Sequence, residues 1–191
     1  STFSKLLIGE KILRISRRSK YLIFHFKKKF LLVHLGMSGK LLLMRSYDNT
    51  IFKTSFYYDL NILQKHNHIY FKFNNGLVLI YNDIRRFGFF KLYNTTQLNK
   101  IIFLKKLGLE PFNKKFNIKY FKKFVKNRKK NIKNLLMDQT FVSGLGNIYV
   151  NETLFLSKIK PLRTCSSLNK NEIRNLILNT KKILKFAISK G

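Results

Sequence analysis

Residues 132–163 read IKNLLMDQTFVSGLGNIYVNETLFLSKIKPLR, and this stretch decides the fold of the C-terminal half of the sequence. Its first part, residues 132–138, carries three apolar side chains at helical spacing: Ile132, Leu135 and Leu136. In its last part, residues 148–159, a predicted helix places three apolar side chains on one face: Ile148, Phe155 and Ile159. The spacing therefore predicts two helices joined by a short connection.

The connection contains the turn Gly144-Leu145-Gly146-Asn147. Glycine adopts positive φ values at little cost, and Asn147 is a suitable N-cap for the helix that follows. A tight turn before a helix exposes unpaired N–H groups beside the positive end of the helix dipole, which suits a phosphate. From these residues alone, an ordinary helical hairpin with a glycine turn is the favoured interpretation.

The composition indicates a folded, strongly basic protein. Among 191 residues, 39 are Lys or Arg and 8 are Asp or Glu, which gives a formal net charge of +31. So much like charge on a compact chain implies a polyanionic partner. The hydrophobic content of 45% and the aromatic content of 15% exclude a disordered basic tail. Charge alone leaves DNA, RNA and an acidic membrane surface open as partners.

The cysteine content and the hydropathy of the sequence restrict where in the cell the protein is expected. The single cysteine, Cys165, excludes an internal disulfide and a zinc site built from several thiolates. Apolar runs are shorter than the roughly 18 residues that span a membrane, so we expect no membrane partner. Glu10, Lys11 and Arg14 interrupt any signal-peptide core, and we expect a cytoplasmic protein. Because the sequence starts at Ser1 without a methionine, we expect a fragment or a processed product.

The N-terminal half has the pattern of an antiparallel β domain. Residues 5–35 have strand character, and residues 46–65 are polar and predict a surface loop. A Lys27-Lys28-Lys29 turn separates the first two predicted strands, and Asn75-Gly76 is a strong hairpin signal. Aromatic and β-branched runs predict strands over residues 21–26, 30–35, 40–44, 68–73, 77–81 and 87–93.

Helical periodicity replaces this pattern after residue 107. Residues 108–111 interrupt regular structure. The last segment ends at Gly191, a candidate C-terminal cap, and carries an apolar stripe of Ile173, Leu176, Ile177, Thr180, Leu184, Ala187 and Ile188. We predict an α+β fold, with a β-sandwich-like domain over 1–107, a linker over 108–114 and a helical domain over 115–191.

Two motifs of the β half contain candidate functional side chains. RRSKYL places Lys20 before a strand among other cations, which lower the pKa of a lysine and favour proton transfer near neutrality. HLGMSG places Met37 between two glycines at the end of a strand. From these residues alone, Lys20 also fits a solvated lysine, and Met37 also fits a core residue at a bulge or turn.

A third motif, NDIRRFG, contains Arg85 and Phe87. The guanidinium is a planar fork of donors, and in a strand Phe87 would point in the same direction as Arg85. Such a pair can occupy a vacated space in DNA, with the arginine bonding a base and the phenylalanine wedging the base step. A surface arginine beside a core phenylalanine is the alternative.

The remaining candidate functional residues lie in two basic segments. KHNH contains His66 and His68, but no cysteine or carboxylate nearby completes a metal site, so no metal is predicted there. KNRKKNIK, residues 126–133, leads into the glycine turn. It is either a solvated charged face or an extension of a contact with a polyanion.

Together these motifs resemble the formamidopyrimidine-DNA glycosylase family, bacterial base-excision enzymes that remove oxidised purines. DQTFVSGLGNIYVNETLF is similar to the helix–two-turns–helix motif of that family. RRSKYL, HLGMSG and RRFG are similar to motifs of its N-terminal domain. The resemblance runs from the region of Arg17 to Arg163, with weaker helical similarity to Gly191.

For the β half, the resemblance implies a catalytic residue and a set of gap-filling residues. Lys20 would lie in the active site and assist the elimination step. Met37, Arg85 and Phe87 would fill the gap left when a nucleotide leaves the stack, with Arg85 bonding the orphaned base. Ile84 stands where the family has proline, which we expect to loosen the loop without removing its arginine or phenylalanine.

The resemblance also implies contacts with the DNA backbone. Lys133 and Asn147 would hold a phosphate, and Glu152 would stand behind that site. Arg128 matches a DNA-binding position that is usually lysine, and His66 would contact DNA. LGLEPF resembles the interdomain link of the family, L-G-P-E-P-L, with one proline replaced.

Other features of the family are expected outside this chain. The family nucleophile is an N-terminal proline followed by glutamate, and its zinc finger of four cysteines and its base-recognising loop lie C-terminally. We therefore expect no cofactor in this chain, and zinc in a C-terminal region of the parent protein. Because the recognising loop is not in the sequence, lesion preference is left open.

The function that follows from the resemblance is a DNA glycosylase with AP lyase activity. The parent would flip an oxidised purine out of damaged double-stranded DNA and attack the sugar carbon with a terminal amine, giving a Schiff base. This chain would supply the scaffold and the DNA contacts but not the nucleophile. We expect a monomer in the bacterial cytoplasm, associated with the nucleoid. The alternatives are a non-catalytic or decayed nucleic-acid-binding protein and a sibling glycosylase for oxidised pyrimidines.

Overall fold

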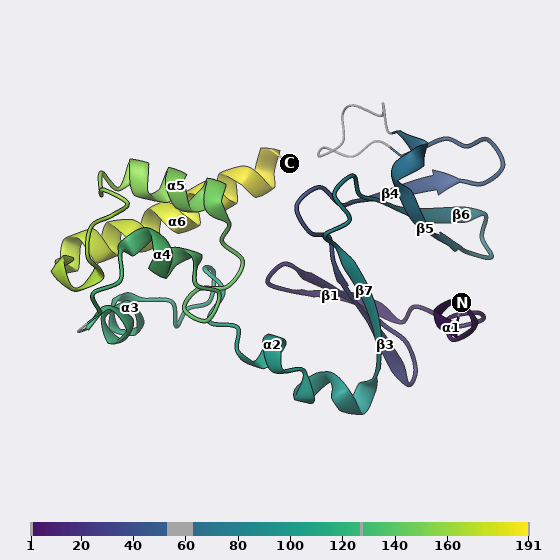
Figure 1. The fold of residues 1–191 in the computed structure, drawn as a ribbon, viewed down its shortest axis with the longest axis horizontal. Helices are drawn as coiled ribbons and strands as arrows, with labels where there is room; N and C mark the ends of the chain where they lie inside the picture. Colours follow the sequence, from purple (N-terminus) through teal and green to yellow (C-terminus); the bar gives the residue numbers. More distant parts are fainter. Residues whose placement is uncertain (1, 53–62, 127, 191) are drawn as a thin grey trace. The chain divides into compact units, whose positions relative to one another are not determined.

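The computed structural model describes residues 2–52, 63–126 and 128–190. These form two compact units, Ser1–Asn99 and Lys100–Gly191 (Figure 1). Strands dominate the first unit and helices the second, so the predicted α+β class is confirmed. Residues 53–62 of the predicted surface loop lie outside the described residues, as does the predicted cap Gly191. The predicted limits of the domains and the linker stay predictions.

The first unit contains two antiparallel sheets (Figure 1). The four-stranded sheet has the order β1-β2-β3-β7, with β1 (Arg14–Arg18), β2 (Tyr21–His25), β3 (Lys29–His34) and β7 (Phe89–Asn94). The three-stranded sheet has the order β4-β6-β5, with β4 (Lys40–Arg45), β6 (Leu77–Asn82) and β5 (Asn67–Lys72). Short helical segments accompany them: α1 (Thr2–Lys5), η1 (Gln64–His66) and η2 (Thr95–Lys100).

Both turns predicted in this unit are present. The Phe26 amide donates to the Lys29 carbonyl at 2.9 Å, which leaves Lys27 and Lys28 at the tip between β2 and β3. In the Asn75-Gly76 hairpin, the Phe73 amide donates to the Leu77 carbonyl at 2.8 Å. Lys29 itself belongs to β3, so the first turn is one residue shorter than predicted.

The core of the first unit lies between the two sheets. Its fully buried members come from the four-stranded sheet and the β2–β3 turn: Phe24, Phe26, Leu31 and Val33. Side chains of the three-stranded sheet pack against them: Leu41, Phe71 and Leu79. Each buried Leu, Val or Phe contributes roughly 1.5–3 kcal/mol relative to exposure, so the apolar strand faces hold the sheets together. The predicted β-sandwich arrangement is confirmed.

The second unit is built from α2 (Ile102–Lys105), α3 (Ile118–Val125), α4 (Ile132–Met137), α5 (Asn147–Leu156), the turn η3 (Cys165–Ser167) and α6 (Lys170–Lys190). Its core is one cluster that includes every one of these elements except α2. Phe141 lies at its centre, fully buried and edge-on to Phe121 at 5.0 Å between ring centroids. The predicted α4 helix is confirmed, with Ile132, Leu135 and Leu136 buried.

The apolar face predicted for the second helix was wrong. Ile148 is 72% exposed and Phe155 is 79% exposed, whereas α5 buries Val150, Thr153 and Leu154. Ile159 is buried, but it lies beyond the end of the helix. Apolar side chains occur on all sides of α5, so their spacing alone does not show which side faces the core.

The apolar stripe of α6 is correct only in its first part. Ile173, Leu176, Ile177 and Thr180 are buried, but Ile188 is 67% exposed. The buried residues lie where α6 packs against α5 and α3. Beyond that contact, the helical periodicity continues with less protein to cover it.

Candidate nucleic-acid interface

Strand register brings three motifs to one end of the four-stranded sheet. Tyr21 pairs with His34, and His34 pairs with Phe89. Lys20 precedes Tyr21, residues 35–39 follow His34, and residues 84–88 precede Phe89. We call residues 35–39 the methionine loop and residues 84–88 the wedge loop. Motifs far apart in sequence are therefore neighbours because of antiparallel pairing.

The side chains predicted to enter DNA are exposed on these two loops. Met37 is 74% exposed and Phe87 is 58% exposed, so neither is a core residue. The Arg85 guanidinium carbon lies 4.6 Å from the centre of the Phe87 ring. The strand predicted over 87–93 begins only at Phe89, so these two residues pair through stacking in a loop, not by sharing a strand face.

The carboxylate of Asp83 joins the two loops. Its Oδ1 accepts from the Ser38 hydroxyl at 2.5 Å and from the Arg85 amide at 3.2 Å. Its Oδ2 accepts from the Tyr81 hydroxyl at 2.7 Å and from the Gly88 amide at 3.1 Å. Burial alone would raise the pKa of Asp83, but these four hydrogen bonds outweigh it and hold the pKa far below its ordinary value. Asp83 is therefore ionised at neutral pH.

Close backbone contact also joins the loops. Gly36 has φ +73°, and a Cβ there would lie 2.7 Å from the Gly88 nitrogen and 2.8 Å from the Phe87 carbonyl carbon. Any side chain at Gly36 would therefore push the wedge loop away. The conformation of HLGMSG thus depends on its glycines, and it places Met37 in solvent.

Lys20 lies in the β1–β2 turn with its side chain partly solvated. Desolvation by the surrounding protein lowers its pKa, in the direction predicted. The cause differs from the one predicted, which was neighbouring cations. The pKa of His34 is also lowered, first by desolvation and then by the charge of Lys20, so the two side chains influence each other.

Ser19, the residue before Lys20, is held in an uncommon conformation. Its φ is 56°, it is buried, and its carbonyl accepts a hydrogen bond from Arg17 Nη1 at 2.8 Å. Non-glycine residues rarely adopt positive φ, and surrounding contacts must impose it. The turn thus gives Lys20 a fixed backbone position.

His66 lies in η1, half-buried, at the start of the three-stranded sheet. Its carbonyl accepts from the Asp83 amide at 3.0 Å, and the His68 ring nitrogen Nε2 lies 2.8 Å from the Asp83 carbonyl. The KHNH segment is therefore attached to the residue that joins the two loops. The predicted DNA contact of His66 stays a prediction.

The second candidate region is the start of α5. Asn147 was predicted as the N-cap, but the N-cap is Gly146 and Asn147 is the first helical residue. Gly146 offers no side-chain cap, whereas Asn117 caps α3, Asn131 caps α4 and Asn169 caps α6. The first amides of α5 therefore have no side-chain cap, and the Asn147 side chain beside them is exposed.

Gln139 holds the glycine turn in place. Its amide nitrogen donates to the carbonyls of Met137 at 3.1 Å and Leu145 at 2.9 Å. Its amide oxygen accepts from the Gly144 amide at 2.9 Å. One side chain therefore links the end of α4 to both sides of the turn that starts α5.

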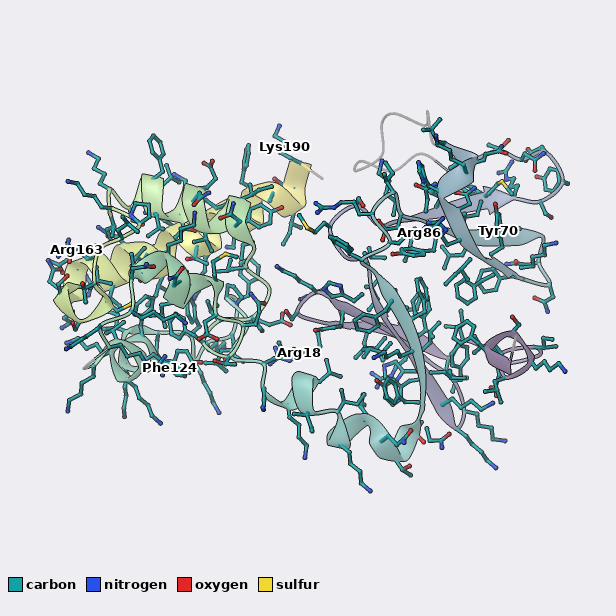
Figure 2. All side chains as sticks on the ribbon, viewed as in Figure 1. Arg18, Tyr70, Arg86, Phe124, Arg163 and Lys190 are labelled. Atoms are coloured by element: carbon teal, nitrogen blue, oxygen red, sulfur yellow. The ribbon has the colours of Figure 1, made fainter. Side chains whose placement is uncertain are left out.

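Basic residues predicted to contact DNA lie in this second unit. Lys133 is on the first turn of α4, and the exposed Arg128 follows α3. The Arg128 guanidinium carbon lies 5.2 Å from the ring centre of Phe124, which Figure 2 labels on α3. Glu152 is exposed on α5. The roles predicted for these residues stay predictions.

Sequence reasoning missed Asp83 and Gln139. A signal for Asp83 was present, since a carboxylate between a buried apolar strand and an arginine-rich loop needs several donors. Gln139 gives no such signal, because a glutamine after a helix is usually a solvated residue.

A helix that starts without a side-chain cap, a strongly basic composition and two linked loops with exposed apolar side chains indicate a protein that binds a polyanion. The family models agree with that class. Residues 1–90 match the formamidopyrimidine-DNA glycosylase N-terminal domain, and residues 107–191 match the formamidopyrimidine-DNA glycosylase H2TH domain. This chain belongs to the formamidopyrimidine-DNA glycosylase family.

Bacterial relatives support the assignment over nearly the whole chain. The formamidopyrimidine-DNA glycosylase of Oceanobacillus iheyensis is 38% identical over 99% of this chain, which spans 63% of that protein. That of Rickettsia bellii is 40% identical over 97% of the chain, which spans 63% of it. That of Bartonella tribocorum is 40% identical over 99% of the chain, which spans 67% of it.

Solved structures give the same result for the fold. A complex of the Lactococcus lactis enzyme with DNA containing an abasic site has a TM-score of 0.83 and 37% identity, covering 98% of this chain and 65% of that one. Its complex with DNA containing Fapy-dG has a TM-score of 0.83 and 38% identity, covering 98% and 66%. Among the described residues, no helix is long and apolar enough to cross a membrane.

Proposed function

We propose that the protein to which this chain belongs is a base-excision DNA glycosylase with AP lyase activity on oxidised purines in duplex DNA. The observation that carries the proposal is the exposure of Met37, Arg85 and Phe87 on two loops fixed by one buried carboxylate. Apolar side chains that are exposed singly are ordinary, but Met37 and Phe87 lie on two linked loops beside Arg85, and such a grouping can be covered by a partner. Family membership, and the damaged DNA bound in the Lactococcus structures, support damaged duplex DNA as that partner.

Each exposed side chain has a distinct role in the proposal. Phe87 and Met37 fill the space that a flipped nucleotide leaves in the base stack. Met37 suits an irregular gap because its thioether side chain is flexible. Arg85 donates hydrogen bonds to the base that has lost its partner, and stacking on Phe87 restricts the guanidinium to one plane.

The start of α5 holds the DNA backbone. Its free amides, Asn147 and Lys133 donate to one phosphate, while Arg128 and His66 add further contacts. Glu152 lies on the same helix as Asn147 and supports this site from behind. Such contacts position the protein without reading sequence, so they act on damaged and undamaged duplexes alike.

Lys20 serves the elimination step. A lysine with a lowered pKa is deprotonated more often near neutral pH than a free one, and it can then transfer a proton. Because the Ser19 turn fixes its backbone, Lys20 needs little reorganisation to reach the sugar. The attacking amine is a different group, expected at the N-terminus of the whole protein, in keeping with the family.

We infer that the zinc of this family is not held by the residues that the structure describes. No group of three or more His, Cys, Asp or Glu residues is arranged for a metal in residues 2–52, 63–126 and 128–190. Cys165 is buried in the core of the second unit. Since these residues do not fit zinc, no step depends on it, and we place the zinc site of the family in a C-terminal region.

We further propose that the protein is a monomer of the bacterial cytoplasm and acts on nucleoid DNA.

The proposal is tested by trapping the reaction in the full-length protein. Borohydride reduction on a duplex containing Fapy-dG is expected to yield a covalent protein–DNA adduct, and Lys20→Ala is expected to slow strand cleavage at least about tenfold. Lys27→Ala is the matched control, because it removes the same charge at the opposite end of the sheet. Binding without any adduct would identify a non-catalytic DNA-binding protein. Preferential excision of oxidised pyrimidines would identify the sibling activity.

A further inference from the structure

We propose that Asp83 is a positioning residue that makes the methionine loop and the wedge loop a single unit, so that Met37, Arg85 and Phe87 enter damaged DNA together. The inference rests on the proposed function, because it assumes that these three side chains enter the gap. Asp83 is fully buried and touches no DNA itself. Its role is to fix side chains that do.

An ionised carboxylate without partners is very unfavourable in a protein interior, so a buried one implies a dedicated set of donors. Asp83 has four, two on each oxygen. These donors come from three separate segments: the methionine loop, the end of β6, and both ends of the wedge loop.

Ser38 makes the connection between the loops direct. Its hydroxyl donates to Asp83 Oδ1 and also lies 3.2 Å from the Arg85 amide, as an acceptor. The residue after Met37 is thus bonded both to the carboxylate and to the backbone of Arg85. A displacement of one loop must therefore break hydrogen bonds of the other.

The wedge loop needs this support because part of it is strained. Arg86, labelled in Figure 2, has φ 56°, a value that non-glycine residues rarely adopt. Asp83 accepts hydrogen bonds from the residues on either side of this strained segment, Arg85 and Gly88. The Tyr81 hydroxyl bonded to Oδ2 belongs to a ring that packs on Phe90 at 4.7 Å between centroids, which ties the carboxylate to the core.

The gap-filling side chains themselves have little else to hold them. Met37 and Phe87 are mostly exposed, so packing does not determine where they stand. Their positions follow from the loop backbones, and Asp83 is the residue bonded to both. The prediction is that weakening this carboxylate lowers selectivity for damaged DNA while backbone contacts elsewhere are unchanged.

The experiment uses this chain and two duplexes of equal length, one intact and one with a stable abasic analogue beside 2-aminopurine. Fluorescence of 2-aminopurine rises when its stacking is disturbed, so it reports entry of the side chains. The variant is Asp83→Asn, which keeps the shape but removes the charge and replaces an acceptor by a donor. Asp48→Asn is the matched control, because it removes the charge of an exposed carboxylate in the same unit.

We expect Asp83→Asn to bind the intact duplex within about twofold of Asp48→Asn, and to lose about tenfold of the preference for the abasic duplex. The increase in 2-aminopurine fluorescence on binding should also be smaller for Asp83→Asn. Equal losses on both duplexes, or full preference with a normal rise, would overturn the role of Asp83. A wild-type chain with no preference for the abasic duplex would instead overturn the proposed function together with this inference.

Ser38→Ala keeps the test decisive if Asp83→Asn does not fold. It removes one hydroxyl from the connection and leaves the carboxylate with three donors. Met37→Ala and Arg85→Ala are then combined in the native background and in Ser38→Ala. A positioning role predicts that their effects on abasic preference are strongly non-additive in the native background and become additive without Ser38. Additivity in both backgrounds would show that the loops act independently and would contradict the proposal.

Discussion

The two regions proposed to contact DNA are built in opposite ways. In the first unit, a buried charge on Asp83 fixes two loops, and the groups offered to DNA are side chains. In the second unit, the neutral amide of Gln139 fixes the glycine turn, and the groups offered are mainly backbone amides at an uncapped helix end. The first arrangement supplies side chains shaped to fill a gap in the base stack. The second supplies a binding site for phosphate.

This difference predicts which measurements respond to which region. Gap-filling side chains matter only where a base stack is broken, so changes in the first unit should alter selectivity. Backbone amides meet the same phosphate on any duplex, so changes in the second unit should alter affinity without selectivity.

Arg85→Ala should give the largest effect. In the full-length protein, we expect turnover of a Fapy-dG duplex to fall about 100-fold, since the orphaned base loses its partner. The melting temperature should stay nearly unchanged, because the side chain is exposed. Arg45→Ala is the matched control, since Arg45 also stacks on an aromatic ring, Phe52, at 5.2 Å but lies outside the two loops. A large loss of melting temperature with normal turnover would return Arg85 to a structural role.

Gln139→Ala should act on affinity alone. The substitution removes three hydrogen bonds that shape the turn before α5. We expect binding of intact and abasic duplexes to weaken equally, by about tenfold, measured by titration of labelled DNA. Gln97→Ala, which removes an exposed amide bonded to the Asn94 amide in the first unit, should leave both affinities unchanged. A loss confined to the abasic duplex would show that the turn also takes part in selectivity.

Lowering the pH should reduce the free energy of unfolding of the first unit, because Asp83 becomes protonated. This effect should be smaller than those of Arg85→Ala and Gln139→Ala. Because the folded-state pKa lies below the ordinary value of 3.8, the unfolded state binds protons first as pH falls. The stabilisation is therefore complete above the ordinary pKa and is lost as pH falls below it, by about 1–3 kcal/mol. The Tyr81 hydroxyl, which donates to Asp83, has a raised pKa and keeps its proton throughout this range.

The measurement is thermal unfolding between about pH 5 and pH 2.5, comparing the wild type with Asp83→Asn. Other acidic residues with lowered pKa values, Asp138 and Glu172 among them, contribute to both proteins. The difference between the two curves isolates Asp83, and it should shrink as pH falls. A constant difference would mean that its ionisation adds nothing to stability.

The sequence was sufficient wherever one local signal determined one local structure. Asn75-Gly76 predicted its hairpin, and Ile132, Leu135 and Leu136 predicted a buried helix face, because each signal lies within a few residues. The exposure of Met37 was not determined by its own chemistry, which fits a core equally well. Only its place in HLGMSG, through the family resemblance, indicated a surface role.

Where the sequence was insufficient, contacts between distant residues decided the outcome. The spacing of Ile148 and Phe155 predicted one apolar helix face, but the buried side of α5 depends on where α6 packs. Asn147 looked like a cap because of its type, yet the chain bends one residue earlier, at Gly146. Asp83 is bonded to Ser38, 45 residues away, and no local pattern encodes that pair.

One substitution in each region tests whether filling the gap in the base stack and binding phosphate are separate functions of the two units. Phe87→Ala and Asn147→Ala leave the net charge unchanged, and Asn151→Ala serves as control one helical turn further along α5. Affinities for intact and abasic duplexes are measured for each across a range of salt concentrations.

We predict that Asn147→Ala weakens binding to both duplexes alike and leaves the slope of log K against log salt nearly unchanged, because it removes a neutral hydrogen-bond donor and no charge. We predict that Phe87→Ala leaves the slope and the intact-duplex affinity unchanged and removes most of the abasic preference. If Phe87→Ala weakened both duplexes equally, or if Asn147→Ala removed only the abasic preference, the two regions would not be separate and the account would be contradicted.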